Sequence, residues 1–321
     1  MWSRRKLLIA VILGIALSNG TGSTQNTKAS SMTDEIRRYE LMVQQQPAQN
    51  DGDTWWQLAR LYQDSARYRD AERAYRKAVE LLKTADRRTY ANVMDCMGTM
   101  YVETGLYAQA EQLERDALAL REAENDSIGV GVSWMHLAML SLGKRQLAEA
   151  TRYAELAADR LVPERNGDAA SNRATPEEKM TALIYLALAR CALGACADAL
   201  PELALASDIA QMSHPNESFL TAYIDFLMGY AHWKNGDNGP AAELMKRGTT
   251  GMEAQLGWGH PTYIAAMTAY EAFLRQTRRN AEAAEVQTKI ASIQTLHKKP
   301  ELAGTDTAPG IIAQHEDYQL K

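Results

Sequence analysis

The sequence has few of the residues that build β-sheets. Valine and isoleucine together number 22 of the 321 residues, whereas alanine alone numbers 51. Because β-branched side chains favour strands and alanine favours helices, an all-β fold is excluded. Glycine (20), proline (9) and cysteine (3) are also scarce, which excludes a collagen-like chain and a small disulfide scaffold. The length and the 46% of hydrophobic residues suit one large core or an array of repeats.

An excess of positive charge is absent too. The chain has 35 Lys and Arg residues against 40 Asp and Glu, a net charge of -5. Removal of a leader that carries Arg4, Arg5 and Lys6 would make it -5 - 3 = -8. A protein that binds a polyanion needs a basic surface, so we expect no nucleic acid among the partners.

Short catalytic and cofactor-binding motifs are missing. The sequence has no phosphate-binding loop, dinucleotide fingerprint, HExxH, GxSxG or CxxC motif. The histidines do not have the spacing of metal ligands; they are His136, His214, His232, His260, His297 and His315. We therefore predict a protein that is not an enzyme and that binds neither a cofactor nor a metal.

The amino terminus has the form of a secretory signal peptide. The positive cluster at residues 4–6 precedes an apolar run from Leu7 to Leu17, and small residues follow it. The run has 11 residues, and a membrane-spanning helix takes about 20, so we expect membrane contact only if the leader stays uncleaved. We predict a signal peptide over residues 1–20 and a mature protein in the periplasm or outside the cell. Both the Sec and the twin-arginine export routes fit this leader.

Export would place three cysteines in an oxidising compartment, and three is an odd number for a disulfide framework. Cys191 and Cys196 form the only plausible pair, because a spacing of five near a helix end could bring them within bridging range. Small buried cysteines inside helices explain these two and Cys96 equally well, and we favour that interpretation.

The strongest signal is an internal repeat. Trp55, Leu58, Ala59 and Tyr62 share one face of a helix, a break lies near Ser65, and a second helix follows with its own apolar face. The same offsets recur along the chain, and one small residue of each second helix marks them: Ala71, Ala110, Ala150, Ala199, Ala241 and Ala283. Their spacings of 39, 40, 49, 42 and 42 residues predict a series of helical hairpins.

This pattern resembles the tetratricopeptide repeat (TPR), and the long spacing with His-Pro at 214–215 and 260–261 resembles the kinesin-light-chain type. The resemblance implies an all-α, right-handed solenoid of about six TPR units over residues 51–296. The leader implies that the protein is exported and of bacterial type. The units are expected near residues 52–88, 91–124, 131–162, 176–212, 218–255 and 262–296. Two residues depart from the TPR pattern, which usually has other residue types at the positions of Asp225 and His232.

The segments around the repeats have distinct patterns. We expect a flexible linker over residues 21–32, a capping helix over 33–50 and a disordered tail over 297–321. Between the third and fourth units, a polar loop should end at Thr175, where Thr-Pro-Glu-Glu is a typical start of a helix.

One helical stripe is the best candidate for a binding site. Tyr223, Phe226, Tyr230 and Trp233 are spaced by three, four and three residues, and the TPR resemblance assigns their side to the concave groove. Equivalent positions in other units are Trp56, Arg60, Met135 and Met139, with Ile184 and Leu188 in the fourth. Packing of the aromatic residues against the adjacent hairpin would give the same periodicity.

The function that these patterns favour is a non-catalytic scaffold that binds a partner polypeptide in its concave groove. One alternative is an enzyme or ligand receptor that uses Asp225 and His232, which lie on one helical face, as an acid and base. Another is a structural subunit that associates with itself in an envelope complex. The sequence identifies no particular partner.

Overall fold

The computed structural model describes residues 25–45, 51–65, 67–84, 86–166, 173–213, 219–256 and 260–297. Within these ranges the chain forms 13 α-helices and two short 3-10 helices, and it has no strand, so the predicted all-α fold is confirmed. The predicted signal peptide lies outside the described residues, as does the predicted tail after His297. No helix of the described part has both the length and the apolar character needed to cross a membrane.

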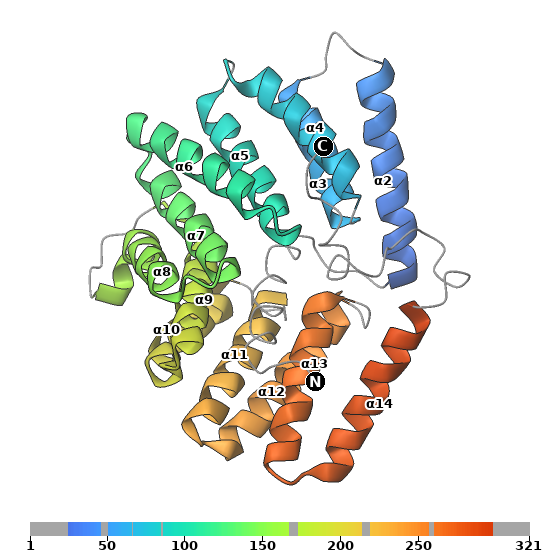
Figure 1. Cartoon of the computed structure of the whole chain (residues 1–321), viewed down its shortest axis with the longest axis vertical. Coiled ribbons are helices and arrows are strands. Elements are labelled where there is room, and N and C mark those ends of the chain that lie inside the picture. The colour runs from blue at the N-terminus through green and yellow to red at the C-terminus, as the bar shows by residue number, and fades with distance from the viewer. Residues whose placement is uncertain are drawn as a thin grey trace.

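Six helical hairpins follow one another after a single first helix, α2 (Gln25–Gln45), as Figure 1 shows. The hairpins are α3 (Gly52–Asp64) with α4 (Tyr68–Leu82), α5 (Arg87–Glu103) with α6 (Tyr107–Ala123), α7 (Ser127–Gly143) with α8 (Leu147–Leu161), α9 (Pro176–Leu193) with α10 (Leu200–Ser213), α11 (Phe219–Asn235) with α12 (Asn238–Leu256), and α13 (Pro261–Gln276) with α14 (Asn280–His297). The 3-10 helices η2 (Pro163–Asn166) and η3 (Cys196–Ala199) flank α9.

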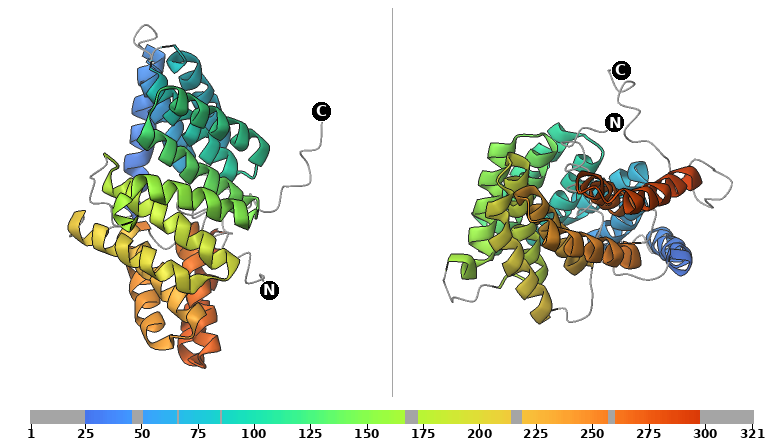
Figure 2. Two further views of the ribbon diagram at one scale, coloured as in Figure 1. Left: turned by 90° about the vertical axis from the view of Figure 1, so that its left-hand side faces the viewer. Right: turned by 90° about the horizontal axis from the view of Figure 1, so that it is seen from below.

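Each hairpin packs against the next to give a curved solenoid (Figures 1 and 2). The alanines that mark the repeat are 0–1% exposed; five lie in the second helices of their hairpins, whereas Ala199 lies in η3. In the fifth hairpin a Cβ on Gly248 would lie 2.5 Å from the backbone nitrogen of Phe226. Small residues at these positions therefore allow the paired helices to approach closely.

Helix α9 begins as its sequence predicts. The Thr175 side chain accepts a hydrogen bond from the backbone of Glu178, and the Glu178 carboxylate accepts one from the backbone of Thr175. This reciprocal capping box satisfies two amide groups at the start of the helix, and Pro176 occupies its first turn.

Helix α2 differs from its predicted bounds. It begins at Gln25, eight residues before the expected start at 33, so residues 25–32 are helical where a linker was expected. The physical reason is that no glycine or proline lies between Gly22 and Pro47, so nothing in the sequence stops a helix there.

Candidate functional site

The first helices of the hairpins form a continuous inner layer. Contacts join each first helix to the next along the series α3, α5, α7, α9, α11 and α13. In the described part of the chain, any contacts between the second helices of successive hairpins are weaker than these. The solenoid therefore curves with its first helices on the inside, and a partner held by the curvature would meet these helices.

The predicted aromatic stripe lies on α11 but is largely buried. Tyr223 is 0%, Phe226 1% and Trp233 6% exposed, and Tyr230 is half-buried. The expectation that all four form an exposed groove wall is therefore wrong for Tyr223, Phe226 and Trp233.

The packing of the stripe explains this burial. Phe226 lies against Gly248 of α12, and the ring of Trp233 meets that of Phe273 in α13 edge to face, with centroids 5.9 Å apart. The rings of Tyr223 and Phe219 are stacked at 5.5 Å. These side chains fill the space where α11 meets its neighbours.

The other predicted binding residues divide between the core and the inner surface. Met135 and Met139 of α7 are buried. Trp56 and Arg60 of α3 are partly exposed. Of the eight predicted positions, Trp56, Arg60 and Tyr230 therefore keep surface that a partner could contact.

Asp225 and His232, the alternative acid and base, have separate partners. Both carboxylate oxygens of Asp225 accept hydrogen bonds from Arg247 of α12, at 2.6 Å each. The Nδ1 atom of His232 lies 3.4 Å from a carboxylate oxygen of Asp237. The ion pair with Arg247 ties α11 to α12, so Asp225 has a structural role that the sequence pattern did not indicate.

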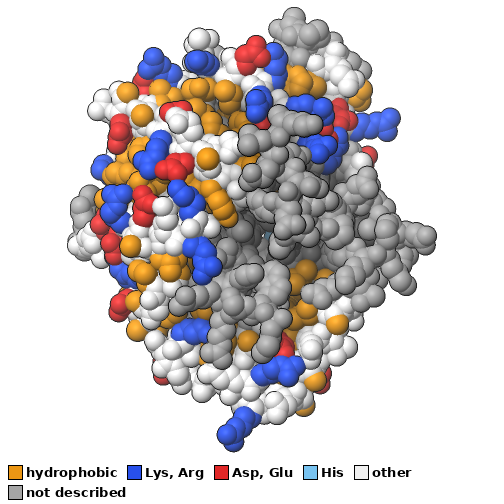
Figure 3. Space-filling model, viewed as in Figure 1, with side chains coloured by type: hydrophobic (Ala, Val, Ile, Leu, Met, Phe, Trp, Pro, Cys, Tyr) orange, Lys and Arg blue, Asp and Glu red, His pale blue; other side chains and the backbone are white. Residues whose placement is uncertain are grey.

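On the face shown in Figure 3, the basic and acidic side chains of the described residues are interspersed. No group of three or more His, Cys, Asp or Glu in the described ranges has the arrangement of a metal site.

Sequence reasoning missed a buried polar cluster between α5, α6 and α7. Arg121 lies 2.5 Å from a carboxylate oxygen of Asp95 and donates hydrogen bonds to Ser133 at 2.6 Å and Asn92 at 2.7 Å. Asp95, Arg121 and Ser133 are 0–3% exposed. No spacing in the sequence marks this cluster, because its members come from three helices.

Two further titratable groups complete this buried polar cluster. Burial, reinforced by the nearby Asp95 carboxylate, raises the pKa of Glu114 well above its usual range. Burial lowers the pKa of His136, whose Nδ1 lies 3.1 Å from the Thr99 hydroxyl and 3.7 Å from Glu114. Both shifts favour the uncharged forms of Glu114 and His136, beside the ion pair of Asp95 and Arg121.

A second polar network links the first two hairpins. The Tyr75 hydroxyl donates to the Gln63 side chain at 2.6 Å, and Gln63 donates to Glu103 at 3.0 Å. Burial raises the pKa of Glu103 to about 8, the hydrogen bond from Gln63 opposes this rise, and the Asp64 carboxylate adds to it.

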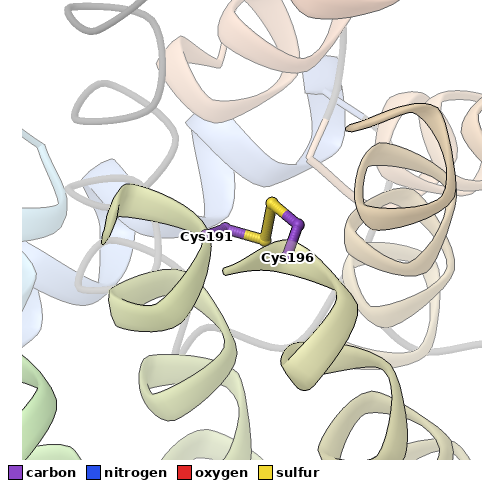
Figure 4. The surroundings of a disulfide bond; sticks show 2 residues. All are labelled: Cys191 and Cys196. Atoms are coloured by element: carbon purple, nitrogen blue, oxygen red, sulfur yellow. A yellow bond between two sulfur atoms is a disulfide. The ribbon is translucent and has the colours of Figure 1, made fainter. Parts of the chain in front are cut away.

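The cysteines also differ from the expected packing. Cys191 and Cys196 form a disulfide with their Cα atoms 4.2 Å apart (Figure 4), because the turn after α9 folds Cys196 back onto the last turn of the helix. The interpretation of both as simple core cysteines is therefore wrong. Cys96 is free, and burial raises the pKa of its thiol to about 11, which keeps it protonated and unreactive at neutral pH.

Comparison with known proteins finds similarity between this chain and repeat proteins. The family model of the tetratricopeptide repeat matches residues 51–123. None of the curated proteins compared with the chain matches it significantly.

Solved structures are similar in fold to much of this chain. The apo form of RapI has a TM-score of 0.63 at 11% identity, and the match covers 85% of this chain and 94% of RapI. A Rap protein complexed with Competence and Sporulation Factor has a TM-score of 0.54 at 13% identity, over 85% of this chain and 87% of that protein. A putative kinesin light chain of Podosopora anserina has a TM-score of 0.49 at 18% identity, over 63% and 94% respectively.

Proposed function

We propose that this chain, a tetratricopeptide-repeat protein, is a non-catalytic scaffold that binds a partner polypeptide along its inner helices in the periplasm or outside the cell. The observation that carries the proposal is the continuous inner layer from α3 to α13. A layer of this kind offers a long curved surface from rigid elements, which suits an extended chain better than a small molecule.

The partly exposed residues of this layer supply suitable anchors. Trp56 and Arg60 lie one turn apart on α3, and Tyr230 of α11 keeps part of its surface. Tryptophan, tyrosine and arginine are the residue types that most often dominate the binding energy of protein interfaces. A protein of similar fold has been solved with Competence and Sporulation Factor bound, which supports a role in binding.

The double variant Trp56→Ala/Arg60→Ala tests this proposal. Random peptides displayed on phage are selected on the exported mature protein, and the affinity of a selected peptide is then measured for each variant. We expect the double variant to weaken binding by about 1 to 4 kcal/mol, the range for truncated anchors. The control is Arg73→Ala on α4, whose side chain is 79% exposed away from the inner layer. Equal binding by the parent protein, the double variant and Arg73→Ala would contradict the proposal.

A stability measurement separates anchors from core. Phe226→Ala should lower the free energy of unfolding by about 3 to 5 kcal/mol, because it empties a buried aromatic site. Trp56→Ala/Arg60→Ala should lower it less, because both side chains keep part of their surface exposed. If both variants destabilise the protein equally, a loss of binding by the double variant reports unfolding and the anchor assignment fails.

The location is proposed from the leader alone. Amino-terminal sequencing of the protein from the exported fraction should find a start near residues 18–22. An intact amino terminus in the membrane fraction would show an uncleaved anchor instead.

A further inference from the structure

The disulfide lies where the fourth and fifth hairpins meet. Helix α9 ends at Leu193, Gly194 reverses the chain with a φ of 92°, and η3 follows before α10. Figure 4 shows the bridge joining the last turn of α9 to η3. The short helix η3 packs against α9 and α10 of its own hairpin and also against α11 of the next. The bridge therefore fixes a segment that contacts two hairpins.

The hydrogen bonds of the charged residues around the bridge depend on the position of the same turn. Arg190, next to Cys191, donates hydrogen bonds at 2.6 Å to the backbone oxygen of Asp198 in η3 and to the Glu202 carboxylate in α10. Glu202 is 6% exposed and also lies 3.4 Å from Arg165 of η2. Displacement of η3 would thus disturb a buried carboxylate as well as the contact with α11.

We propose that Cys191–Cys196 is a thiol–disulfide exchange site, and that its reduction loosens η3 and the contact between the fourth and fifth hairpins. The reaction partner is a dithiol reductant. This inference does not depend on the proposed function.

The two cysteines differ in solvent exposure, and this difference determines which sulfur atom the reductant attacks first. Cys196 is 3% exposed, whereas Cys191 is partly exposed. A thiolate of the dithiol attacks Sγ of Cys191, the bond between the two sulfurs breaks, and Cys196 leaves as a thiolate that takes up a proton. The second thiolate of the reductant attacks its own sulfur in the mixed disulfide and releases Cys191, which is also protonated. Two electrons and two protons pass to the protein, and the reductant becomes a disulfide.

Loss of the bridge should loosen the backbone of the turn that the bridge closes. This turn contains Gly194, which has no Cβ and therefore restricts the backbone least. After reduction, η3 is a single 3-10 turn held by the hydrogen bond from Arg190 to the backbone oxygen of Asp198 and by the burial of Cys196 and Ala199. A turn this short has little stability of its own.

Alkylation followed by mass spectrometry tests whether the site exists. The exported mature protein is treated with iodoacetamide at neutral pH, before and after incubation with dithiothreitol. We expect no label on Cys191 and Cys196 before reduction and label on both afterwards, with Cys191 modified faster. Cys96 should stay unlabelled in both samples, because its buried thiol is protonated. Labelling of Cys191 without reductant would overturn the proposal.

Hydrogen exchange tests whether the bridge controls the contact between hairpins. Reduction should speed amide exchange at least tenfold in peptides from η3 and α11 and leave α5 and α6 unchanged. Cys191→Ser/Cys196→Ser should exchange like the reduced protein and should not respond to dithiothreitol, whereas Cys96→Ser should behave like the parent. Unchanged exchange in α11 of the reduced parent protein would overturn the coupling, whether or not the double variant folds.

Discussion

At the scale of single residues, this protein buries several titratable groups where its helices meet. Asp95 is paired with Arg121, and burial shifts the pKa values of Glu114 and His136 toward their uncharged forms. Asp225 is paired with Arg247 at another junction, where the arginine side chain is 62% exposed. A fully buried pair such as Asp95 with Arg121 adds little net stability, because desolvation of the charges offsets much of their attraction.

Glu103 should make stability depend on pH. Its pKa is about 8 in the folded protein and about 4.5 in an unfolded chain, so the folded state binds the proton more tightly. The stabilisation is fully present below pH 4.5 and is lost as the pH rises through 8. The free energy of unfolding, measured in urea at pH 5 and pH 8, should fall less with pH in Glu103→Gln than in the parent protein. The difference should be up to about 1.4 kcal/mol per pH unit. Glu285→Gln, exposed on α14, is the control, and an unchanged slope in Glu103→Gln would refute the prediction.

At the scale of helices, close approach within each hairpin decides which small residues are required. A Cβ on Gly248 of α12 would lie 2.5 Å from the nitrogen of Phe226 and 2.7 Å from the carbonyl oxygen of Ala222, both backbone atoms of α11. Backbone atoms cannot move aside as a flexible side chain can, so the two helices would have to separate. Gly239, in the same helix, has no neighbouring atom within 4 Å of the position that a Cβ would take.

Two substitutions in α12 should therefore differ in their effects. Gly248→Ala should lower the free energy of unfolding by about 1 to 3 kcal/mol through overpacking. Gly239→Ala should change it by no more than about 0.5 kcal/mol, because its Cβ meets no neighbouring atom. Urea unfolding monitored by circular dichroism measures both. A neutral Gly248→Ala would show that α11 and α12 lie further apart than the structure places them.

At the scale of the whole molecule, the stability of the solenoid is the sum of the contributions of its hairpins and of the contacts between adjacent hairpins. The helix contacts join elements within a hairpin, between adjacent hairpins, or between successive first helices. A solenoid with such contacts is coupled along one dimension, and its ends can open while its centre stays folded.

Unfolding should accordingly differ from one hairpin to another. In variants that retain Trp134 alone or Trp233 alone, the fluorescence transitions in urea should have different midpoints, and the helical circular dichroism should fall over a broader range than either. Coincident midpoints for both tryptophans and for circular dichroism would instead show a single cooperative core.

The sequence by itself determined the hairpin series and its helical class. Recurrent alanines such as Ala71 and Ala110 indicated where helices cross, and Thr175 with Glu178 indicated where α9 begins, because capping and periodicity are local properties. Only the tertiary structure decided that Phe226 and Trp233 are buried, that Arg121 meets Asp95, and that Cys191 and Cys196 are joined. Periodicity shows that side chains share one face of a helix, but burial depends on which neighbouring helix covers that face. Contacts between residues on different helices depend on how the hairpins stack, and the turn after α9 decides whether two cysteines meet.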